Sequence, residues 1–162
     1  MKKIQVGNVF EIATSKGKGY FQYVYKNERT NVELIRVFPN LYMEEPQNIA
    51  DLVLQKEAFF VHFALKAAYR IKIVRLIGNY EVPEGLEIPP KQMRTVLFVR
   101  GEFIFWQIVD YDTWKRKSFK ELTEEQKKLS PWSIWNATLL IERMLEGWTP
   151  EKWNVGQNTE SS

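Results

Sequence analysis

The sequence predicts an α+β fold: a strongly curved antiparallel sheet, or a partly open small barrel, with a C-terminal helix packed on it. Short runs of β-branched and aromatic residues, separated by turn residues, fill the first two thirds of the chain and indicate strands. The last quarter changes to apolar residues at helical spacing. With 162 residues and no cysteine, the chain can bury a core without disulfides. We expect a single domain over residues 1–153 and a flexible polar tail over 154–162.

The first third of the chain predicts three strands joined by tight turns. Strand-favouring residues fill three runs, 9–13, 20–25 and 32–38. Two glycines in 14–19 can adopt positive φ without strain, so this segment predicts a turn. Pro39-Asn40 ends the third run. This order is typical of a meander or of the beginning of a small barrel.

The middle of the chain contains less regular elements. Residues 48–57 suit either a short helix or a loop. Residues 59–66 alternate with a period of two and 71–77 form a second apolar run, so both predict strands. Three prolines and one glycine within 79–94 predict a loop that crosses the surface.

The strongest strand signal is a hairpin made of residues 95–100 and 103–110. Gly101-Glu102 between them matches a type II′ turn, which takes glycine first. The second strand is apolar on both faces apart from Gln107. We therefore expect it to be central in a sheet and covered on both sides, with Trp106 in the core.

The C-terminal part predicts helices. Thr123–Gln126 matches a capping box, in which the threonine and glutamine side chains each bond the other's backbone N–H. Ser130-Pro131 is typical of a helix start, and apolar residues at helical spacing follow. We predict a helix over 131–146 that packs Trp135 on the sheet and ends at Gly147 as its C′ residue. The following Thr-Pro pair predicts one further turn.

Composition argues against several kinds of chemistry. With 23 basic and 20 acidic residues the formal net charge is only +3, so we do not expect nucleic acid as the main partner. The lack of cysteine excludes a cysteine nucleophile, and a single histidine makes a poor transition-metal site. We interpret this residue, His62, as a half-buried strand histidine with a hydrogen-bond partner. We expect no catalytic residues, no metal and no cofactor.

No segment of the sequence predicts targeting or membrane insertion. The N-terminus lacks the apolar core of a signal peptide, and charged residues interrupt the longest apolar stretch, 59–77. We expect a soluble, cytoplasmic protein with no membrane partner.

Several charged residues are candidates for chemistry. Asp110 and Asp112 end the second hairpin strand, where such a pair suits a metal ion such as Mg²⁺, acid–base chemistry or an ordinary turn. Lys16 and Lys18 alternate with glycines before an aromatic strand, but this segment lacks the spacing of a phosphate loop and the stacking residues of an RNA-recognition strand. Together with the run that begins Lys115-Arg116, these lysines support an alternative function as a nucleic-acid-binding small barrel.

Trp114 is the strongest candidate for a contact with a partner protein. It follows Asp112 and precedes three consecutive cations, Lys115, Arg116 and Lys117. A large aromatic side chain with a charged rim is typical of an interface anchor. We therefore predict that Trp114 is at least partly exposed and that it binds a partner together with the charged residues named above.

The order of features resembles the immunity protein 26 family of bacterial polymorphic toxin systems. The resemblance is carried by Val6-Gly7-Asn8-Val9-Phe10-Glu11-Ile12, by the strand around 59–61, and by 73–78 before a proline-containing loop. The chain differs from the family pattern at Asn8, where aspartate is usual, and at Ala13, where proline is usual. The resemblance implies a small cytoplasmic α+β protein without catalytic residues that binds and neutralises a cognate protein toxin.

Overall fold

The computed structural model describes residues 2–155, within which the chain forms nine strands, four α-helices and one 3-10 helix. The strands are β1 Asn8–Thr14, β2 Gly17–Asn27, β3 Val32–Val37, β4 Phe59–Phe63, β5 Val74–Asn79, β6 Gln92–Val99, β7 Glu102–Asp110, β8 Arg116–Phe119 and β9 Ile134–Trp135. The helices are α1 Ile49–Leu54, α2 Leu65–Arg70, α3 Glu124–Lys127, α4 Ala137–Glu146 and the 3-10 helix η1 Pro150–Lys152.

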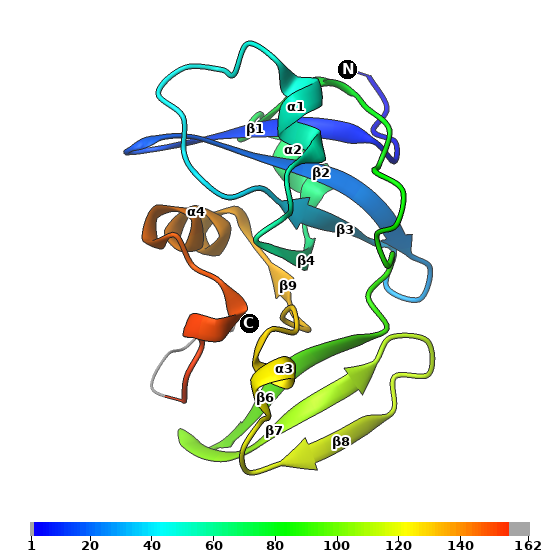
Figure 1. The fold of residues 1–162 in the computed structure, drawn as a ribbon, viewed down its shortest axis with the longest axis vertical. Helices are drawn as coiled ribbons and strands as arrows, with labels where there is room; N and C mark the ends of the chain where they lie inside the picture. The colour runs from blue at the N-terminus through cyan, green and yellow to red at the C-terminus, as the bar shows by residue number, and fades with distance from the viewer. Residues whose placement is uncertain (1, 156–162) are drawn as a thin grey trace.

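The strands form two sheets that lie one above the other in Figure 1. The larger sheet has the order β5-β1-β2-β3-β4-β9, and the smaller has the order β6-β7-β8. All pairs are antiparallel except β4 with β9. The α+β class is therefore confirmed. The larger sheet is open, since β5 and β9 are its two edges, so it is not closed into a barrel.

Helices cover both faces of the larger sheet. Successive residues of a strand point to opposite faces, so neighbouring residues of β1 contact different helices. Val9 of β1 lies in a buried cluster with α1, which contributes Leu52 and Val53. Phe10, the next residue, faces the other side, where Tyr69 of α2 packs against its ring at 5.6 Å. The cluster around Phe10 continues into the smaller sheet and the C-terminal helices, so both sheets share one core.

Arg94 of β6 joins the smaller sheet to the C-terminal segment. Its guanidinium lies between the rings of Trp106 and Trp153, 4.3 and 4.6 Å from their centroids. It donates to the carbonyls of Lys127, Pro150 and Trp153 at 2.8, 2.9 and 3.2 Å. This buried cation is stabilised by aromatic faces and carbonyl dipoles.

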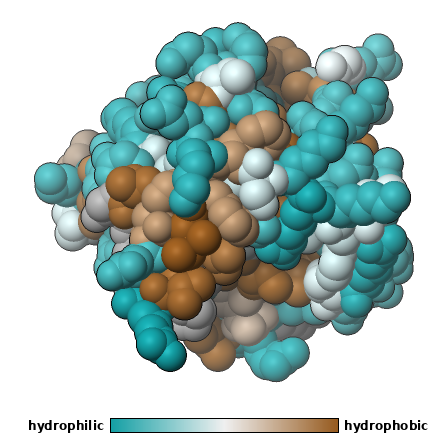
Figure 2. Space-filling model, turned by 90° about the horizontal axis from the view of Figure 1, so that it is seen from below, coloured by the Kyte–Doolittle hydropathy of each residue, from teal (hydrophilic) through white to brown (hydrophobic). Residues whose placement is uncertain are grey.

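The predicted hairpin is present, with a different turn. Val99 pairs with Glu102, so the two loop residues are Arg100 and Gly101, with φ of 52° and 81°. Two positive φ angles make a type I′ turn, so the predicted type II′ turn at Gly101-Glu102 is wrong. The predicted strand is the middle strand of its sheet, but near this turn its coverage is incomplete. Figure 2 shows apolar side chains gathered on this end of the molecule, and Leu97 and Val99 are 36% and 49% exposed.

Two other predictions in the chain are wrong. Residues 65–70 form the helix α2 where strands were expected on both sides, because Ala64 to Ala68 are good helix formers in a segment too short to show periodicity. The C-terminal helix begins after Asn136, whose side chain accepts from Leu139 N–H at 2.9 Å, and not after Ser130. The Ser130 hydroxyl accepts from Phe60 N–H at 2.9 Å, so Ser130 joins the segment that precedes α4 to β4.

The remaining C-terminal predictions are confirmed. The capping box at Thr123 and Gln126 is complete, and Trp106 and Trp135 are buried in the core. Gly147 ends α4 in the left-handed conformation with φ 60°, and η1 supplies the predicted further turn. Of the predicted tail, residues 154–155 are exposed and the rest lies outside the described residues.

Candidate functional site

The loop between β7 and β8, residues 111–115, holds three of the predicted site residues, and Asp110 and Arg116 flank it. The Asp110 carboxylate accepts from the Thr113 N–H at 2.9 Å and from its hydroxyl at 3.1 Å. These two bonds lower the pKa of Asp110, the N–H bond most strongly. Trp114 N–H donates to the Asp110 carbonyl at 2.8 Å and closes the loop. Asp110 therefore holds a turn, while the carboxylate of Asp112 is exposed.

Trp114 is half-buried and stands out from this loop in a costly backbone conformation. Its φ is 64°, in the left-handed region that glycine and asparagine favour and that a bulky residue rarely adopts. The ring meets Trp132 edge to face at 5.5 Å, and the guanidinium of Arg29 lies over it at 4.9 Å. The Arg29 guanidinium also donates to the Asp112 carbonyl at 2.8 Å, which joins the β2–β3 loop to the β7–β8 loop.

A cavity of about 180 Å³ opens beside Trp114. Its lining comes from the ends of the two sheets and the segment before β9: Asn27, Thr30, His62, Trp114, Arg116, Trp132, Ser133 and Ile134. Aromatic side chains therefore flank the cavity, an arginine lies at its rim, and polar groups lie in its wall.

The polar wall is a chain of hydrogen bonds from Asn27 to Tyr111 to His62. The carbonyl oxygen of the Asn27 side chain accepts from Arg29 N–H at 3.0 Å, so its amide nitrogen is the group that bonds the Tyr111 hydroxyl. Burial raises the pKa of Tyr111, which keeps its proton. The Tyr111 oxygen lies 2.6 Å from Nε2 of His62, and burial lowers the pKa of His62 to about 4. Tyr111 and a neutral imidazole therefore share this hydrogen bond.

The cations around Trp114 differ in how firmly they are held. Arg116 donates to the Gln107 side chain at 3.0 Å along the edge strand β8, whereas Lys115 and Lys117 are exposed. Arg29 adds a further cation that the local sequence around Trp114 could not reveal. The site is therefore an aromatic pair with a positive rim.

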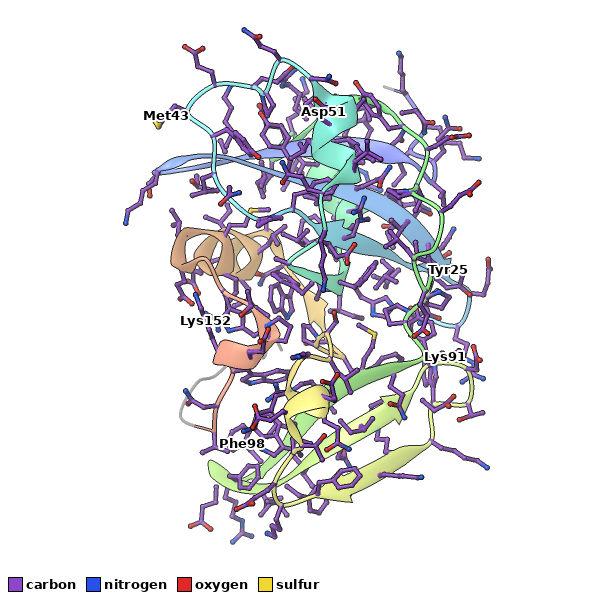
Figure 3. The ribbon with its side chains drawn as sticks, in the orientation of Figure 1. Tyr25, Met43, Asp51, Lys91, Phe98 and Lys152 are labelled. Carbon is purple, nitrogen blue, oxygen red and sulfur yellow. The ribbon has the colours of Figure 1, made fainter. Side chains whose placement is uncertain are left out.

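Lys16 and Lys18 do not belong to this site. They lie in the β1–β2 turn region, at the left of Figure 1, whereas the β7–β8 loop is at the lower right. Lys18 bridges Tyr42 through its backbone, beside Met43, and its ammonium lies 3.8 Å from Glu11. The carbonyl of Lys91 accepts from Tyr111 N–H at 2.9 Å, so Lys91 marks the start of the β7–β8 loop, as Met43 marks the surroundings of Lys18. Met43 and Lys91 are labelled on opposite sides of Figure 3. The two predicted basic segments are thus separate.

Sequence reasoning missed the partners that come from distant segments. His62 is buried with a hydrogen-bond partner, as expected, but its partner Tyr111 is 49 residues away. Trp132 was assigned to a helix, whereas it lies in the loop before β9 and contacts Trp114. One sequence feature pointed toward the contact between Arg29 and Trp114: the polar turn that starts at Asn27 places Arg29 in a loop at the end of a strand.

Comparison of the chain with protein-family models, with curated proteins and with solved structures gave no match in any of the three. Among residues 2–155, no helix has the length and apolar character needed to span a membrane. Within the same residues, no three histidine, aspartate or glutamate side chains come together as a group that could hold a metal ion.

Proposed function

We propose that this chain is a cytoplasmic, non-catalytic protein that binds and neutralises a cognate bacterial toxin, and that Trp114 is the anchor of the contact. The proposal extends the resemblance of residues 6–12 to the immunity protein 26 family. The observation that carries it is the backbone of Trp114. A turn with φ of 64° at this position is best served by glycine or asparagine, so a half-buried tryptophan there costs conformational energy. Binding is a physical reason to keep it.

The surroundings of Trp114 indicate the chemistry of the partner surface. The cavity of about 180 Å³ between Trp114 and Trp132 has the size of a single inserted side chain. Arg29, Lys115 and Arg116 form a positive rim, which favours a partner surface with carboxylates around a protruding apolar group. A toxin of this description need not be a basic nuclease.

The alternative, a nucleic-acid-binding module, receives less support. Its proposed basic residues, Lys16 and Lys18 on one side and Lys115 and Arg116 on the other, lie in separate parts of the molecule, so they form no continuous track for a phosphate backbone. An enzymatic function based on Asp110 and Asp112 is weakened because the Asp110 carboxylate is engaged with Thr113.

The proposal is tested by expressing the product of the gene adjacent to this one, which we expect to be a toxin, and by following the growth of the cells. We expect co-expression of the full chain to restore growth and the purified proteins to form a complex. The Trp114→Gly variant should lose protection while remaining folded, and Lys16→Ala, in the separate basic segment, is the matched control that should keep it. Protection by the Trp114→Gly variant at wild-type level would contradict the assigned surface. A neighbouring gene product that is not toxic would contradict the function.

A further inference from the structure

A groove of about 920 Å³ runs beside β5, the edge strand of the larger sheet. The N-terminal segment, the end of α2 and β5 itself form its sides. Val74 and Leu76 of β5 contribute apolar surface to the lining. Within the described residues, no strand pairs with the outer side of β5, so its outward N–H and C=O groups are available to another chain.

Among the described residues, the charged side chains that line the groove are all cations. They are Lys2, Lys3, Lys72 and Arg75, and no aspartate or glutamate of this part of the chain lines the groove. Arg75 shares its charge with Glu11, at 3.1 Å, and with Glu45. The three lysines are exposed and form no ion pair with any residue in the part of the chain that the structure describes. The groove therefore favours an anionic occupant.

Lys72 reaches the groove from a position that normally holds glycine. α2 ends with bonds from Lys72 N–H to the Tyr69 carbonyl at 3.1 Å and from Ile73 N–H to the Ala68 carbonyl at 2.9 Å. Gly147 closes α4 with the same two bonds. Both residues are left-handed, with φ of 63° and 60°, but only glycine adopts this conformation without cost. Glycine at position 72 would therefore end α2 at a lower conformational cost than lysine does.

We propose that this groove binds an acidic, extended peptide segment that pairs with β5 as an additional strand. Main-chain hydrogen bonds to the edge of β5 would provide affinity for any extended peptide, and the lysines would select peptides that carry carboxylates. The inference is independent of the proposed function. The N-terminal segment that lines the groove is at the top of Figure 1, and the β7–β8 loop is at the lower right.

The lining of the groove argues against single-stranded nucleic acid as the occupant. Such strands bind where bases stack on aromatic side chains beside a basic track. Tyr69 is the one aromatic residue that lines the groove, and its ring is half-buried and packed edge to face on Phe10. An edge strand with apolar side chains offers a peptide more contacts than it offers a base.

The proposal is tested with a fluorescein-labelled octapeptide of alternating glutamate and valine, titrated with the full-length protein at low salt. We expect saturable binding with a Kd of the order of 10 µM. The same peptide with every backbone nitrogen methylated keeps its side-chain charge but has no N–H group to donate to a strand, so it should bind at least about tenfold more weakly. Equal binding of the methylated peptide, or no saturation by the unmodified one, would overturn the proposal.

Protein variants localise the peptide to the groove. The double variant Lys3→Glu with Lys72→Glu should weaken binding by about tenfold or more, because two attractive contacts become repulsive. Lys117→Glu on β8 is the matched control and should change the affinity less than about twofold. Lys72→Gly should bind severalfold more weakly while unfolding at a higher urea concentration. Tighter binding of a uridine octamer than of the peptide, sensitive to the same double variant, would replace the peptide by RNA.

Discussion

The buried His62 should make the protein lose stability in mild acid. Burial lowers its pKa from 6.5 to about 4 in the folded protein, where Nε2 is hydrogen-bonded to the Tyr111 hydroxyl. The unfolded chain therefore binds a proton at a higher pH than the folded protein does. The free energy of unfolding should fall as the pH drops below about 6.5, and the loss should level off near pH 4. The pKa difference corresponds to about 3 kcal/mol.

Urea unfolding followed by tryptophan fluorescence measures this effect when wild type and His62→Gln are compared between about pH 7 and about pH 4. Glutamine does not titrate, whereas the carboxylates are common to both proteins and cancel in the comparison. Wild type should lose about 3 kcal/mol more than the variant over this range. Parallel pH profiles, within about 0.5 kcal/mol, would refute a buried neutral histidine. At about pH 7 the variant should keep partner binding within a few-fold of wild type.

Three substitutions test how the core and the helix ends are stabilised. Trp135→Ala should cost about 3–5 kcal/mol in chemical denaturation, because the ring is fully buried against Phe59 at 5.2 Å, and a loss below about 1 kcal/mol would reject this packing. Gly147→Ala should cost about 1 kcal/mol by the same measurement, purely from its left-handed backbone, since no atom lies within 4 Å of the added Cβ; an unchanged stability would contradict the cap. Arg94→Met should cost about 3 kcal/mol and shift the melting temperature down, because three carbonyls, two of them buried, lose their donor, whereas Lys117→Met should leave it unchanged; equal effects would show that Arg94 does not hold the C-terminal segment on the smaller sheet.

Elements set by neighbouring residues could be predicted from the sequence. The first three strands, the hairpin, the capping box at Thr123 and the helix end at Gly147 all depend on contacts within a few residues. The hairpin turn was misplaced by one residue because Arg100 adopts a positive φ that arginine rarely takes. The register of the sheet pairs Val99 with Glu102, and this pairing outweighs the preference of Arg100 for a negative φ.

Elements set by distant contacts could not be predicted in this way. Ser130-Pro131 fits a helix start, but the hydroxyl of Ser130 bonds Phe60 N–H, 70 residues away. The division into two sheets and the edge position of β5 depend on pairings between remote segments. Short elements such as α2 carry too few residues for their periodicity to be seen.

The candidate site shows the same division. The sequence alone indicated a partly exposed Trp114 next to three cations in the chain, and in the structure Trp114 is half-buried. Its contacts with Arg29 and Trp132, and the buried pair of His62 and Tyr111 next to the cavity, come from other parts of the chain. The left-handed backbone of Trp114, which carries the functional argument, depends on the closure of the β7–β8 loop.

The affinity and the stability of one variant, Trp114→Gly, together test the central claim that this tryptophan serves binding and not folding. Glycine relieves about 1 kcal/mol of backbone strain. It loses the contacts with Trp132 and Arg29, each about 1 kcal/mol. The free energy of unfolding should therefore stay within about 1 kcal/mol of wild type. The affinity for the cognate toxin, measured by titration calorimetry, should fall by about 30-fold, or about 2 kcal/mol. A loss of stability as large as that of Trp135→Ala, or an unchanged affinity, would contradict the claim.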